Sequence, residues 1–424
     1  MLILLSDGAG LTARQCATLL ARAGHQVEAL SPDPLCLCRL TRHVRAVHQV
    51  PGFGADPFGW LDAALDIAAR RGAELLLPVQ EQVSVMALAR DRIVAAGLLT
   101  AVPDFGALAQ VQDKVSAFRT LARAGLPQPS ASVATSRAEL ETSGTLPAFV
   151  KTPIGTASAG VYRVGSVPEL RQLAARYERD GVFAAGGVLV QESVSGPLVM
   201  IQSVFARGEL VAFHACQRVR EGAGGGASHK LGLPLPAARE QVMRLGALLG
   251  WHGALSADVI ASAQGPQLID INPRLVEPVN AYLSGADLVG ALVEVARSGT
   301  ARLREAGARD RQGVRTHQLL LAVLGAAQRG GRLAVAGELG NALSRAGDYR
   351  GSAEELTPLR GDPLAAVPVT VAALATLIRP EMWRHFTGGA VGAYSLTPDG
   401  WDQLTSAWRE AGGVRPGLDE GAAG

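Results

Sequence analysis

The chain has 424 residues, of which 48% are hydrophobic and 18% charged, a composition typical of a globular protein with room for roughly two to four domains. Its 40 Lys and Arg residues are interspersed with 38 Asp and Glu residues, which excludes the strong positive charge expected of a nucleic-acid-binding protein. The four cysteines show neither CxxC spacing nor a disulfide framework, which favours a cytoplasmic location and apolar packing roles for them.

Residues 1–105 alternate expected strands and helices. MLILLSD predicts a first buried strand, and helices are expected at TARQCATLLARAG, at FGWLDAALDIAARRG and from about residue 82 to 96. Such alternation predicts a parallel α/β sheet with crossover helices. The turn SDGAGLT lacks the GxGxxG pattern, so a tight strand-to-helix turn is expected, with a ligand contact as the alternative.

A second domain is expected over residues 106–190. The stretch DKVSAFRTLARAGLPQP predicts a helix closed by Gly125, and a strand then carries Lys151 into a loop of small residues. Backbone N–H groups in such a loop are well suited to cover phosphates. The loop residues singled out are Gly155, Thr156, Ser158 and Gly160. A strand ending at Gln191 and Glu192 follows.

The next stretch, residues 191–300, begins with a hairpin expected to turn at Arg207 and Gly208. It continues into EGAGGGASHKLG, which carries His229 and Lys230 and which we expect to be flexible. A lid over a site is favoured for this loop, and a plain linker is the alternative.

The segment LIDINPRLVEPVN contains a short polar pattern in an apolar strand. Residues two apart in a strand share one face, so Asp270, Asn272 and Arg274 are expected on the same side. A hairpin through SAQGPQ would bring Asp258 close to them. Carboxylate and amide oxygens beside a guanidinium suit Mg²⁺ that carries phosphate, whereas the alternative is a solvated face of an edge strand.

Lysine is rare in this chain. Lys114, Lys151 and Lys230 are the only lysines among 40 basic residues. A lysine ammonium is a compact charge that fits a tight phosphate site, so each lysine is a candidate functional residue, with chance survival as the alternative.

Residues 301–424 are expected to form a helical extension. VRTHQLLLAVLGAAQ, GELGNALSRAG and residues 364–378 predict helices, followed by a short ending with Trp401 and Trp408 and a disordered GLDEGAAG. Helices this apolar need burial against the core or against a second subunit, so a homodimer is the alternative to packing on the core. Residues 364–378 are too short to span a membrane and contain Pro368, which predicts no transmembrane segment; contact with a membrane surface is the alternative to burial.

The ordered motifs resemble those of the ATP-grasp superfamily, in its carbamoyl-phosphate-synthetase-like carboxylate–amine ligase branch. The motifs are LLPVQEQ, QDKVSAFRTLARAGLPQP, FVKTPIGTASAGV, VLVQESVSG, the Arg218 strand with its glycine loop, and LIDINPR. The resemblance covers roughly residues 1–300. It implies a mixed α/β and α+β fold with a Rossmann-like N-terminal domain (1–105), a lid subdomain (106–190) and a C-terminal ATP-grasp subdomain (191–300), to which this chain adds the helical extension (301–424).

The resemblance also implies an ATP site with assigned residues. Lys114 and Lys151 would contact phosphates under the loop 155–160. Gln191, Glu192 and Val194 would meet the adenine. Mg²⁺, or Mn²⁺ in its place, would be held by Asp258, Asp270 and Asn272. Arg274 and Arg218 would lie against the transferring γ-phosphoryl group.

Several positions depart from the family pattern. Leu198 stands where many members have a glutamate for the ribose, so ribose recognition must differ. Glu277 and Asn280 follow Arg274 in an unusual LVEPVN and are expected to face the acceptor, with helix-cap or surface roles as the alternatives. Lys230 is expected to reach the γ-phosphate or the carboxylate substrate when its loop closes. His229 is a candidate substrate residue, although a plain polar loop residue is favoured.

The function implied is an ATP-dependent ligase. It would activate a carboxylate as an acyl phosphate, releasing ADP, and transfer the acyl group to an amine. The alternatives are a bicarbonate-using carboxylase or carbamoyl-phosphate-type enzyme, and a catalytically silent nucleotide-binding protein. The chain contains no biotin-carrier or glutamine amidotransferase segment, which weighs against the second, and its intact set of lysines and metal ligands weighs against the third.

Overall fold

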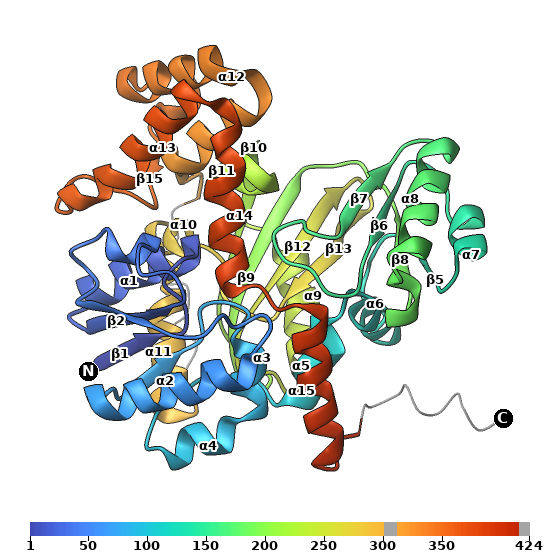
Figure 1. The fold of residues 1–424 in the computed structure, drawn as a ribbon, viewed down its shortest axis with the longest axis horizontal. Coiled ribbons are helices and arrows are strands. Elements are labelled where there is room, and N and C mark those ends of the chain that lie inside the picture. The colour runs from blue at the N-terminus through green and yellow to red at the C-terminus, as the bar shows by residue number, and fades with distance from the viewer. Residues whose placement is uncertain (301–311, 415–424) are drawn as a thin grey trace.

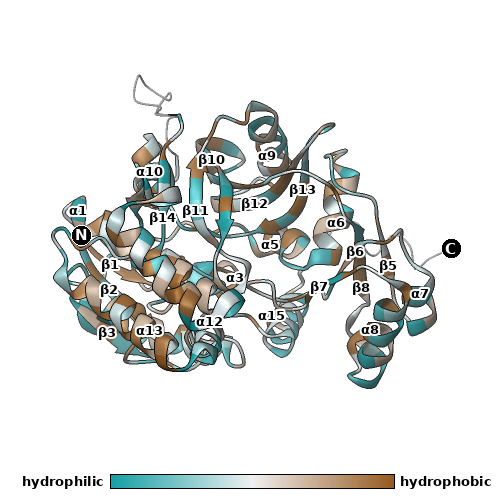
Figure 2. Cartoon of the chain, turned by 90° about the horizontal axis from the view of Figure 1, so that it is seen from above, coloured by the Kyte–Doolittle hydropathy of each residue, from teal (hydrophilic) through white to brown (hydrophobic). Residues whose placement is uncertain are grey.

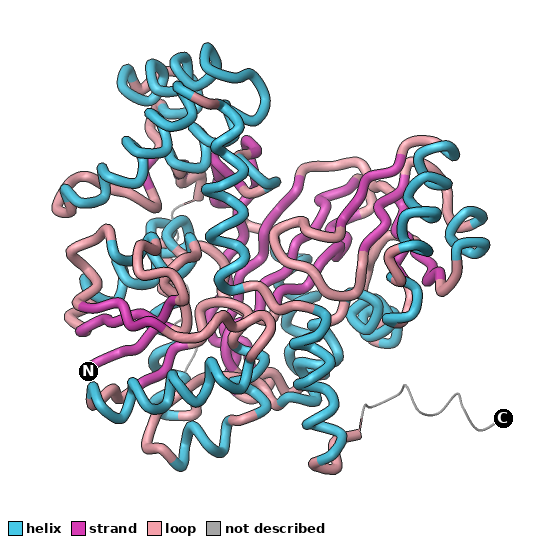
Figure 3. The backbone as a smooth tube through the Cα atoms, in the orientation of Figure 1, coloured by secondary structure: helices cyan, strands magenta, loops and turns pink. Residues whose placement is uncertain are grey.

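The computed structural model describes residues 1–300 and 312–414, which are arranged around three sheets (Figures 1 and 3). The expected disorder of GLDEGAAG lies outside the described residues. One sheet lies near the N-terminus, a second forms an outlying lobe, and a third, larger sheet lies between that lobe and the C-terminal helices.

The N-terminal sheet is parallel, as predicted, with strand order β3-β2-β1-β4. Its strands are β1 (Leu2–Leu5), β2 (Gln26–Ser31), β3 (Ala46–Gln49) and β4 (Leu75–Leu77). The connecting helical segments are α1 (Leu11–Arg22), η1 (Leu37–Arg39), α2 (Pro57–Arg71), α3 (Val83–Leu88), α4 (Arg90–Ala95) and α5 (Phe105–Gln112). The single helix predicted for residues 82–96 is two helices, because the backbone leaves the helical conformation at Ala89.

The outlying lobe contains an antiparallel sheet in the order β5-β8-β6-β7. Its strands are β5 (Ala131–Ala134), β6 (Ala148–Lys151), β7 (Val161–Val164) and β8 (Val188–Glu192). Its helical segments are α6 (Lys114–Arg123), α7 (Arg137–Thr142), α8 (Val167–Arg179) and η2 (Val182–Ala185). Leu140 and Leu170 from α7 and α8 pack with Val150 and Val190 of the sheet, which gives the lobe a hydrophobic core of its own.

The large sheet is mixed, with strand order β13-β12-β9-β10-β11-β14-β15. Its strands are β9 (Leu198–Ala206), β10 (Glu209–Glu221), β11 (Ala227–Gly232), β12 (Gly253–Ser262), β13 (Gly265–Asn272), β14 (Arg315–His317) and β15 (Ala353–Glu354). Helical segments η3 (Ala223–Gly225), α9 (Pro236–Leu248), α10 (Val279–Ser284) and α11 (Leu288–Ser298) accompany them. The predicted hairpins β9–β10 and β12–β13 are confirmed.

The glycine-rich stretch differs from its prediction. Residues 227–232 form strand β11, in which Lys230 pairs with Arg218 of β10 on one side and with Thr316 of β14 on the other. The prediction of a flexible lid is therefore wrong for His229 and Lys230, because pairing on both edges fixes their backbone. The turn that remains is residues 222–226.

The last part of the chain contributes strands and helices that pack against the rest of the molecule. It supplies β14 and β15 to the large sheet and then continues as helices. These are α12 (Leu319–Ser344), η4 (Gly347–Tyr349), η5 (Pro363–Ala365), α13 (Ala366–Ile378), η6 (Pro380–Met382), α14 (Trp383–Tyr394) and α15 (Pro398–Glu410). The short ending predicted after residue 378 thus contains two α-helices, and Trp401 and Trp408 both lie in the second of them, α15.

Helices α14 and α15 reach back across the molecule (Figure 1). At the start of α14, Trp383 packs with a cluster that contains Ala223 of η3, and near its end Ala393 joins the core of the N-terminal sheet. Trp401 and Trp408 of α15 then contact Phe105, with ring centroids 5.7 and 5.3 Å apart. We call α14 and α15 together the strap.

One helical segment, Leu319–Tyr349, is long and apolar enough to cross a membrane by length and composition. Half of its most apolar window is buried inside the structure, and the helix is kinked at Gly331, where φ is 64°. A single helix that passes this test is weak evidence for a membrane span, because core helices of globular proteins pass it as well. Next to it, α13 buries small residues and exposes Val367, Val371, Leu374 and Ile378, and Figure 2 shows the hydrophobic colour along it.

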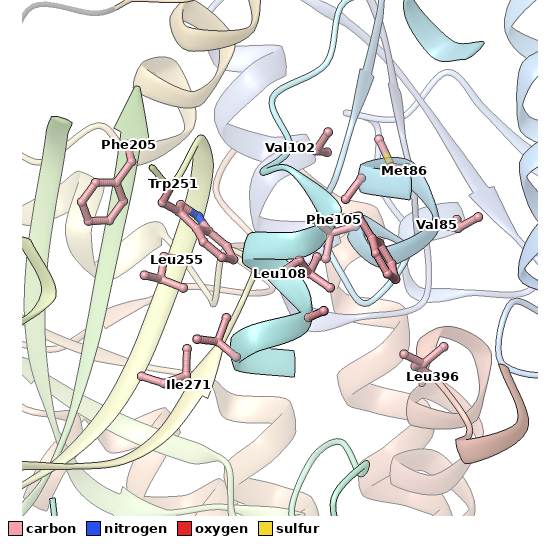
Figure 4. Close-up of a cluster of buried hydrophobic side chains, with 14 of the residues drawn as sticks. Val85, Met86, Val102, Phe105, Leu108, Phe205, Trp251, Leu255, Ile271 and Leu396 are labelled. Atoms are coloured by element: carbon pink, nitrogen blue, oxygen red, sulfur yellow. The ribbon is translucent and has the colours of Figure 1, made fainter. Parts of the chain in front are cut away.

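A shared hydrophobic cluster joins the N-terminal helices to the large sheet (Figure 4). Phe105 and Leu108 of α5 pack with Trp251 and Ile271 of the β12–β13 region, and Leu396, which lies between the two helices of the strap, belongs to the same cluster. Because this core is continuous, the strands that carry the polar site are held rigidly against the N-terminal sheet.

Candidate functional site

A pocket lies where helix α6, the lobe sheet and strand β13 meet. Lys114, Lys151, Gln191 and Asp270 line it, so the structure brings together four residues that the sequence nominated. Its other walls are largely apolar, which suits a planar base between aliphatic side chains. They include Phe118, Leu121, Leu189, Leu268 and Ile271.

Each pocket lysine is held by a backbone carbonyl. Lys151 donates to the carbonyl oxygen of Ile269 at 2.6 Å, and Lys114 donates to that of Gly155 at 2.8 Å. The pairing of β12 with β13 shifts register after Asp258, and Ile269 has no partner there, so it is a bulge residue. Burial lowers the pKa of Lys151, an effect that the Asp270 carboxylate opposes. Neither ammonium is held by a carboxylate, so both can exchange a carbonyl for phosphate.

The loop of residues 152–160 is a closed turn. The amide of Thr152 donates to the carbonyl of Gly160 at 2.9 Å, and Ala157 and Ser158 have left-handed backbones with φ of 52° and 66°. Gly160 has a φ of 76°, and a Cβ there would collide with the side chain of Thr152. Such turns aim backbone N–H groups outward, in agreement with a phosphate cover.

This loop meets the turn of residues 222–226. A Cβ on Gly225 would lie 2.9 Å from Ser158 Oγ, so the two turns touch. Arg218 donates from Nη1 to the Gly225 carbonyl at 2.7 Å and also contacts Glu221. Arg218 therefore fixes the turn that lies next to the loop of residues 152–160.

Asp258 and Asp270 lie directly opposite one another on β12 and β13, as the hairpin prediction required. Burial and the neighbouring Asp270 carboxylate raise the pKa of Asp258 to about 7. Asn272 pairs with Ser256 at the next position on the sheet. Within residues 1–300 and 312–414, no three acidic, histidine or cysteine side chains gather in a way that could hold a metal. Two facing carboxylates and an amide still fit Mg²⁺, which is commonly bound by one or two carboxylates together with substrate phosphates and water.

Arg274 lies just beyond the end of β13, in a turn where its amide donates to the Asn272 carbonyl at 2.7 Å. Its Nε donates to Glu81 Oε1 at 3.0 Å, and Glu81 also accepts from Gln112 at 2.9 Å. The guanidinium thus connects the metal end of the pocket with the N-terminal domain. Glu81 follows β4, within the LLPVQEQ motif.

Lys230 has a different environment from the one predicted. Its Nζ is hydrogen-bonded to Glu277 and, at 2.6 Å, to Glu355, and the side chain is 1% exposed. Burial alone would lower the pKa of Lys230, but the two carboxylates raise it overall. Gln318 also donates to Glu277, at 2.6 Å. Lys230 is therefore fixed in the structure, and its role toward the substrate remains a prediction.

Glu277 and Asn280 are both buried, so a surface role is excluded for them. Glu277 has a left-handed φ of 44°, a strained conformation for a non-glycine residue that is frequently found at functional sites. The Asn280 side chain contacts His214 at 2.8 Å and Thr316 at 2.6 Å. Asn280 therefore ties α10 to the large sheet, and an acceptor role stays a prediction for both residues.

His229 packs inside the protein, not in a loop. Its ring stacks on His317 at 5.7 Å and meets Tyr349 edge-on at 4.7 Å. Burial lowers the pKa of His229 to about 3. The remaining predicted adenine residues, Glu192 and Val194, lie at and beyond the end of β8 and do not line the pocket.

Sequence reasoning did not single out five residues that surround Arg274 and Lys230. Glu81 binds Arg274, Glu355 binds Lys230, and Gln318 donates to Glu277, which is the other carboxylate on Lys230. Asp7 and Tyr394 lie within electrostatic reach of Arg274. Glu81 belongs to a motif that carried the resemblance, but the other four gave no local signal.

The three sheets, and the pocket between the lobe sheet and the large sheet, can be compared with known proteins. No family model matches this sequence, and no curated protein matches it. Among solved structures, the biotin carboxylase of Campylobacter jejuni superposes with a TM-score of 0.58 at 16% identity, covering 74% of each chain. The chain has the ATP-grasp fold.

Two further ATP-grasp structures give similar values. The biotin carboxylase domain of Hydrogenobacter thermophilus 2-oxoglutarate carboxylase has a TM-score of 0.57 at 17% identity and covers 74% of this chain and 73% of its own. The L-amino acid ligase of Bacillus licheniformis has a TM-score of 0.56 at 15% identity and covers 75% and 79%. At such identities the likeness establishes the fold and not the reaction.

Proposed function

We propose that this protein is an ATP-dependent ligase that joins a carboxylate to an amine. The observation that carries the proposal is the convergence of Lys114, Lys151, Gln191 and Asp270 on one pocket, with Asp258 opposite Asp270. Cations for phosphate, oxygen ligands for a metal and an apolar slot for a base are together the parts that phosphoryl transfer from ATP needs.

In the first step, a carboxylate oxygen of the substrate attacks the γ-phosphorus of ATP. A new P–O bond forms, the bond to the bridging oxygen breaks, and ADP leaves. Lys114, Lys151 and Arg274 would offset the negative charge that gathers as two anions meet. When Mg²⁺ or Mn²⁺ is held by Asp258, Asp270 and Asn272, it supplies further positive charge for the phosphate oxygens.

In the second step, the amine nitrogen attacks the carbonyl carbon of the acyl phosphate. A C–N bond forms, the C–O bond to phosphate breaks, and phosphate leaves with the proton that the nitrogen loses. The turns at 152–160 and 222–226, which touch above the strand ends, would exclude water from the acyl phosphate.

The competing function is carboxylation or carbamoyl-phosphate-type chemistry with bicarbonate, which the two biotin carboxylase neighbours support. The L-amino acid ligase neighbour supports the ligase. The carboxylates that surround Arg274 also favour the ligase, because a cationic acceptor suits them better than bicarbonate does. A silent nucleotide-binding protein would have no use for the facing carboxylates of Asp258 and Asp270.

ADP release over a panel of carboxylates, with hydroxylamine as the trapping nucleophile, tests the proposal. Carboxylate-dependent ADP together with a hydroxamate product is the expected result. Bicarbonate dependence would instead establish the carboxylase, and ATP binding without turnover would establish the silent protein. Asp270→Asn should abolish ADP release, whereas Asp104→Asn, an exposed change at the start of α5, should not.

The homodimer that is the alternative for the apolar helices is also proposed here. The 2-oxoglutarate carboxylase domain is described as a dimer, which supports it. Light scattering on the purified chain is expected to give twice the mass of one chain, and a single-chain mass would refute the proposal.

A further inference from the structure

Arg274 separates the ATP pocket from a second polar region. On one side of it lie the metal residues of β13, and on the other lies Glu81, at 3.0 Å. Tyr394, the last residue of α14, lies within electrostatic reach of Arg274, Asp7, Glu81 and Glu277. The strap therefore brings a side chain to a place where the N-terminal domain and the large sheet meet.

Asp7 carries a buried charge with no cation in contact. It follows β1, its Oδ1 accepts from the amide of Ala9 at 3.0 Å, and its Oδ2 accepts from that of Gly10 at 2.6 Å. Burial raises the pKa of Asp7 to about 6, so the group is still mainly ionised at pH 7. No ion pair to Asp7 exists within the described part of the chain.

Gln80 supplies a second, independent sign of a ligand. Its side chain is 2% exposed, and its Oε1 has no hydrogen-bond partner among the described residues. Its carboxamide lies over Gly10 beside Asp7, with Nε2 as the nearer end: a Cβ on Gly10 would collide with Gln80 Nε2 and would lie 2.8 Å from Asp7 Oδ2. A buried acceptor without a donor is costly, which points to a donor that arrives with a ligand.

The charges of the region are not balanced by the protein itself. Asp7, Glu81, Glu277 and Glu355 are acidic, whereas Arg274 and Lys230 are the basic groups that contact this set. Buried charges need partners, so the region lacks positive charge. An ammonium group has three N–H donors and one positive charge, and it would meet both needs.

We propose that Asp7, Gln80 and Tyr394 bind the ammonium group of the amine acceptor, on the side of Arg274 away from the ATP pocket. The inference rests on the proposed ligase function and defines the acceptor as a primary amine that binds protonated. One ammonium proton would pass to the Asp7 carboxylate before the nitrogen attacks, and the proton lost on forming the amide would leave with phosphate. The Asp7 carboxylate, the Gln80 Oε1 and the Tyr394 hydroxyl would accept its three hydrogen bonds. The strap then serves as part of the substrate site.

The test compares amines with hydroxylamine, which is uncharged at neutral pH, as acceptors for the same carboxylate. Asp7→Asn and Tyr394→Phe are expected to raise the KM for a primary amine, glycinamide being the first probe, by about tenfold or more. The factor by which the KM for the amine rises should be about ten times larger than the factor by which hydroxylamine-dependent ADP release falls. Equal losses with both acceptors would overturn the proposal, because they would indicate only a displaced Arg274.

Asp56→Asn is the matched control. Asp56 caps α2 by accepting from the amide of Gly59 at 2.8 Å, as Asp7 does for Gly10, but it lies on the outside of the N-terminal domain. It should leave both acceptors unaffected. If Asp7→Asn does not fold, Gln80→Met and Tyr394→Phe decide the question by the same ratio.

A binding measurement distinguishes failure of the ammonium site from failure of the proposed ligase function. With ADP and Mg²⁺ present, glycinamide should raise the Tm of the wild-type protein, whereas glycolamide, which has a hydroxyl in place of the ammonium, should not. Tyr394→Phe should reduce the shift. A wild-type protein without hydroxamate product refutes the proposed function, whereas equal Tm shifts with the two amides, or none with either, refute the ammonium site.

Discussion

Lys151 and Lys230 are both almost fully buried, but their ammonium groups have different hydrogen-bond partners. Lys151 lies in the pocket and donates to a neutral carbonyl, that of Ile269. Lys230 lies between β10 and β14 and is bound by the carboxylates of Glu277 and Glu355. The first ammonium has given up its water without gaining a negative partner, and the second has gained two.

This difference separates binding from stability. An unpaired buried ammonium is costly to the free protein, and a phosphate that arrives later recovers that cost as binding energy. An ammonium that is already bound by two carboxylates has few N–H donors free for a ligand. Its removal leaves two buried carboxylates without a cation. The same residue type, equally buried, is therefore expected to serve a ligand in one region and the fold in the other.

The largest effect is expected from Lys230→Met. Removal of the ammonium leaves Glu277 and Glu355 close together without a cation, so the free energy of unfolding should fall by about 3–5 kcal/mol. Urea denaturation followed by circular dichroism measures it. Adding Glu355→Gln to this variant should restore part of the loss. If Lys230→Met costs less than about 1 kcal/mol, the contrast between the two lysines is invalid.

The next effect is expected from Lys151→Met. Because its ammonium contacts only a carbonyl, the free energy of unfolding of the ligand-free protein should stay the same or increase. The kcat/KM for ATP should fall by about 100-fold, as is typical when a group that stabilises transition-state charge is lost. ADP release and urea denaturation on one preparation test both statements. Arg119→Met, a change on α6 outside the pocket, is the control for the apolar substitution.

A smaller effect should appear in the pH dependence of stability near Lys230. Burial lowers the pKa of His229 to about 3 and that of His317 to about 4. Below pH 6.5 these two histidines are protonated in the unfolded chain but stay neutral in the folded chain. The free energy of unfolding is therefore highest above pH 6.5 and falls as the pH drops toward 4. The slope is about 1.4 kcal/mol per pH unit for each histidine.

Replacing His317 by Gln should make that slope shallower. The measurement is urea denaturation at several pH values between 4 and 7. Parallel curves for His317→Gln and the wild type would show that these rings are not desolvated as the structure implies.

The smallest effect is expected from Gly160→Ala in the phosphate loop. A left-handed backbone costs a non-glycine residue about 1–2 kcal/mol, and the added Cβ meets Thr152. The KM for ATP should rise roughly fivefold. Gly165→Ala, just after β7, is the matched control, because the nearest atom to a Cβ there is 3.7 Å away. Equal effects of the two substitutions would refute a special role for the loop.

Local pattern was enough to predict the parallel sheet, the hairpins and the meeting of Asp258 with Asp270. All of these follow from strand periodicity and from turns a few residues long. The bulge at Ile269, which presents a carbonyl to Lys151, interrupts that periodicity without any sign in residue type. For this reason the sequence allowed residues of the pocket to be predicted, but not the hydrogen bonds that they make.

The prediction of a flexible loop failed at Lys230 because the residues that pair with it are far away in the sequence. The glycines before it indicated flexibility, and only the pairing with Thr316 and the contact with Glu355 overrule that local signal. Tyr394 was missed for the same reason, and so was the docking of Trp401 and Trp408 on Phe105. Amphipathic helices can be predicted from sequence, but the surface on which they dock cannot.

The strap also has a consequence for the order in which the chain folds. Phe105 is synthesised well before its aromatic cover, because Trp401 and Trp408 lie far later in the sequence. During synthesis the N-terminal domain must therefore wait with an uncovered apolar face, which is the kind of surface that chaperones bind. We expect ribosome-bound chains stalled before α15 to be retained by chaperones, and completed chains to be released from them.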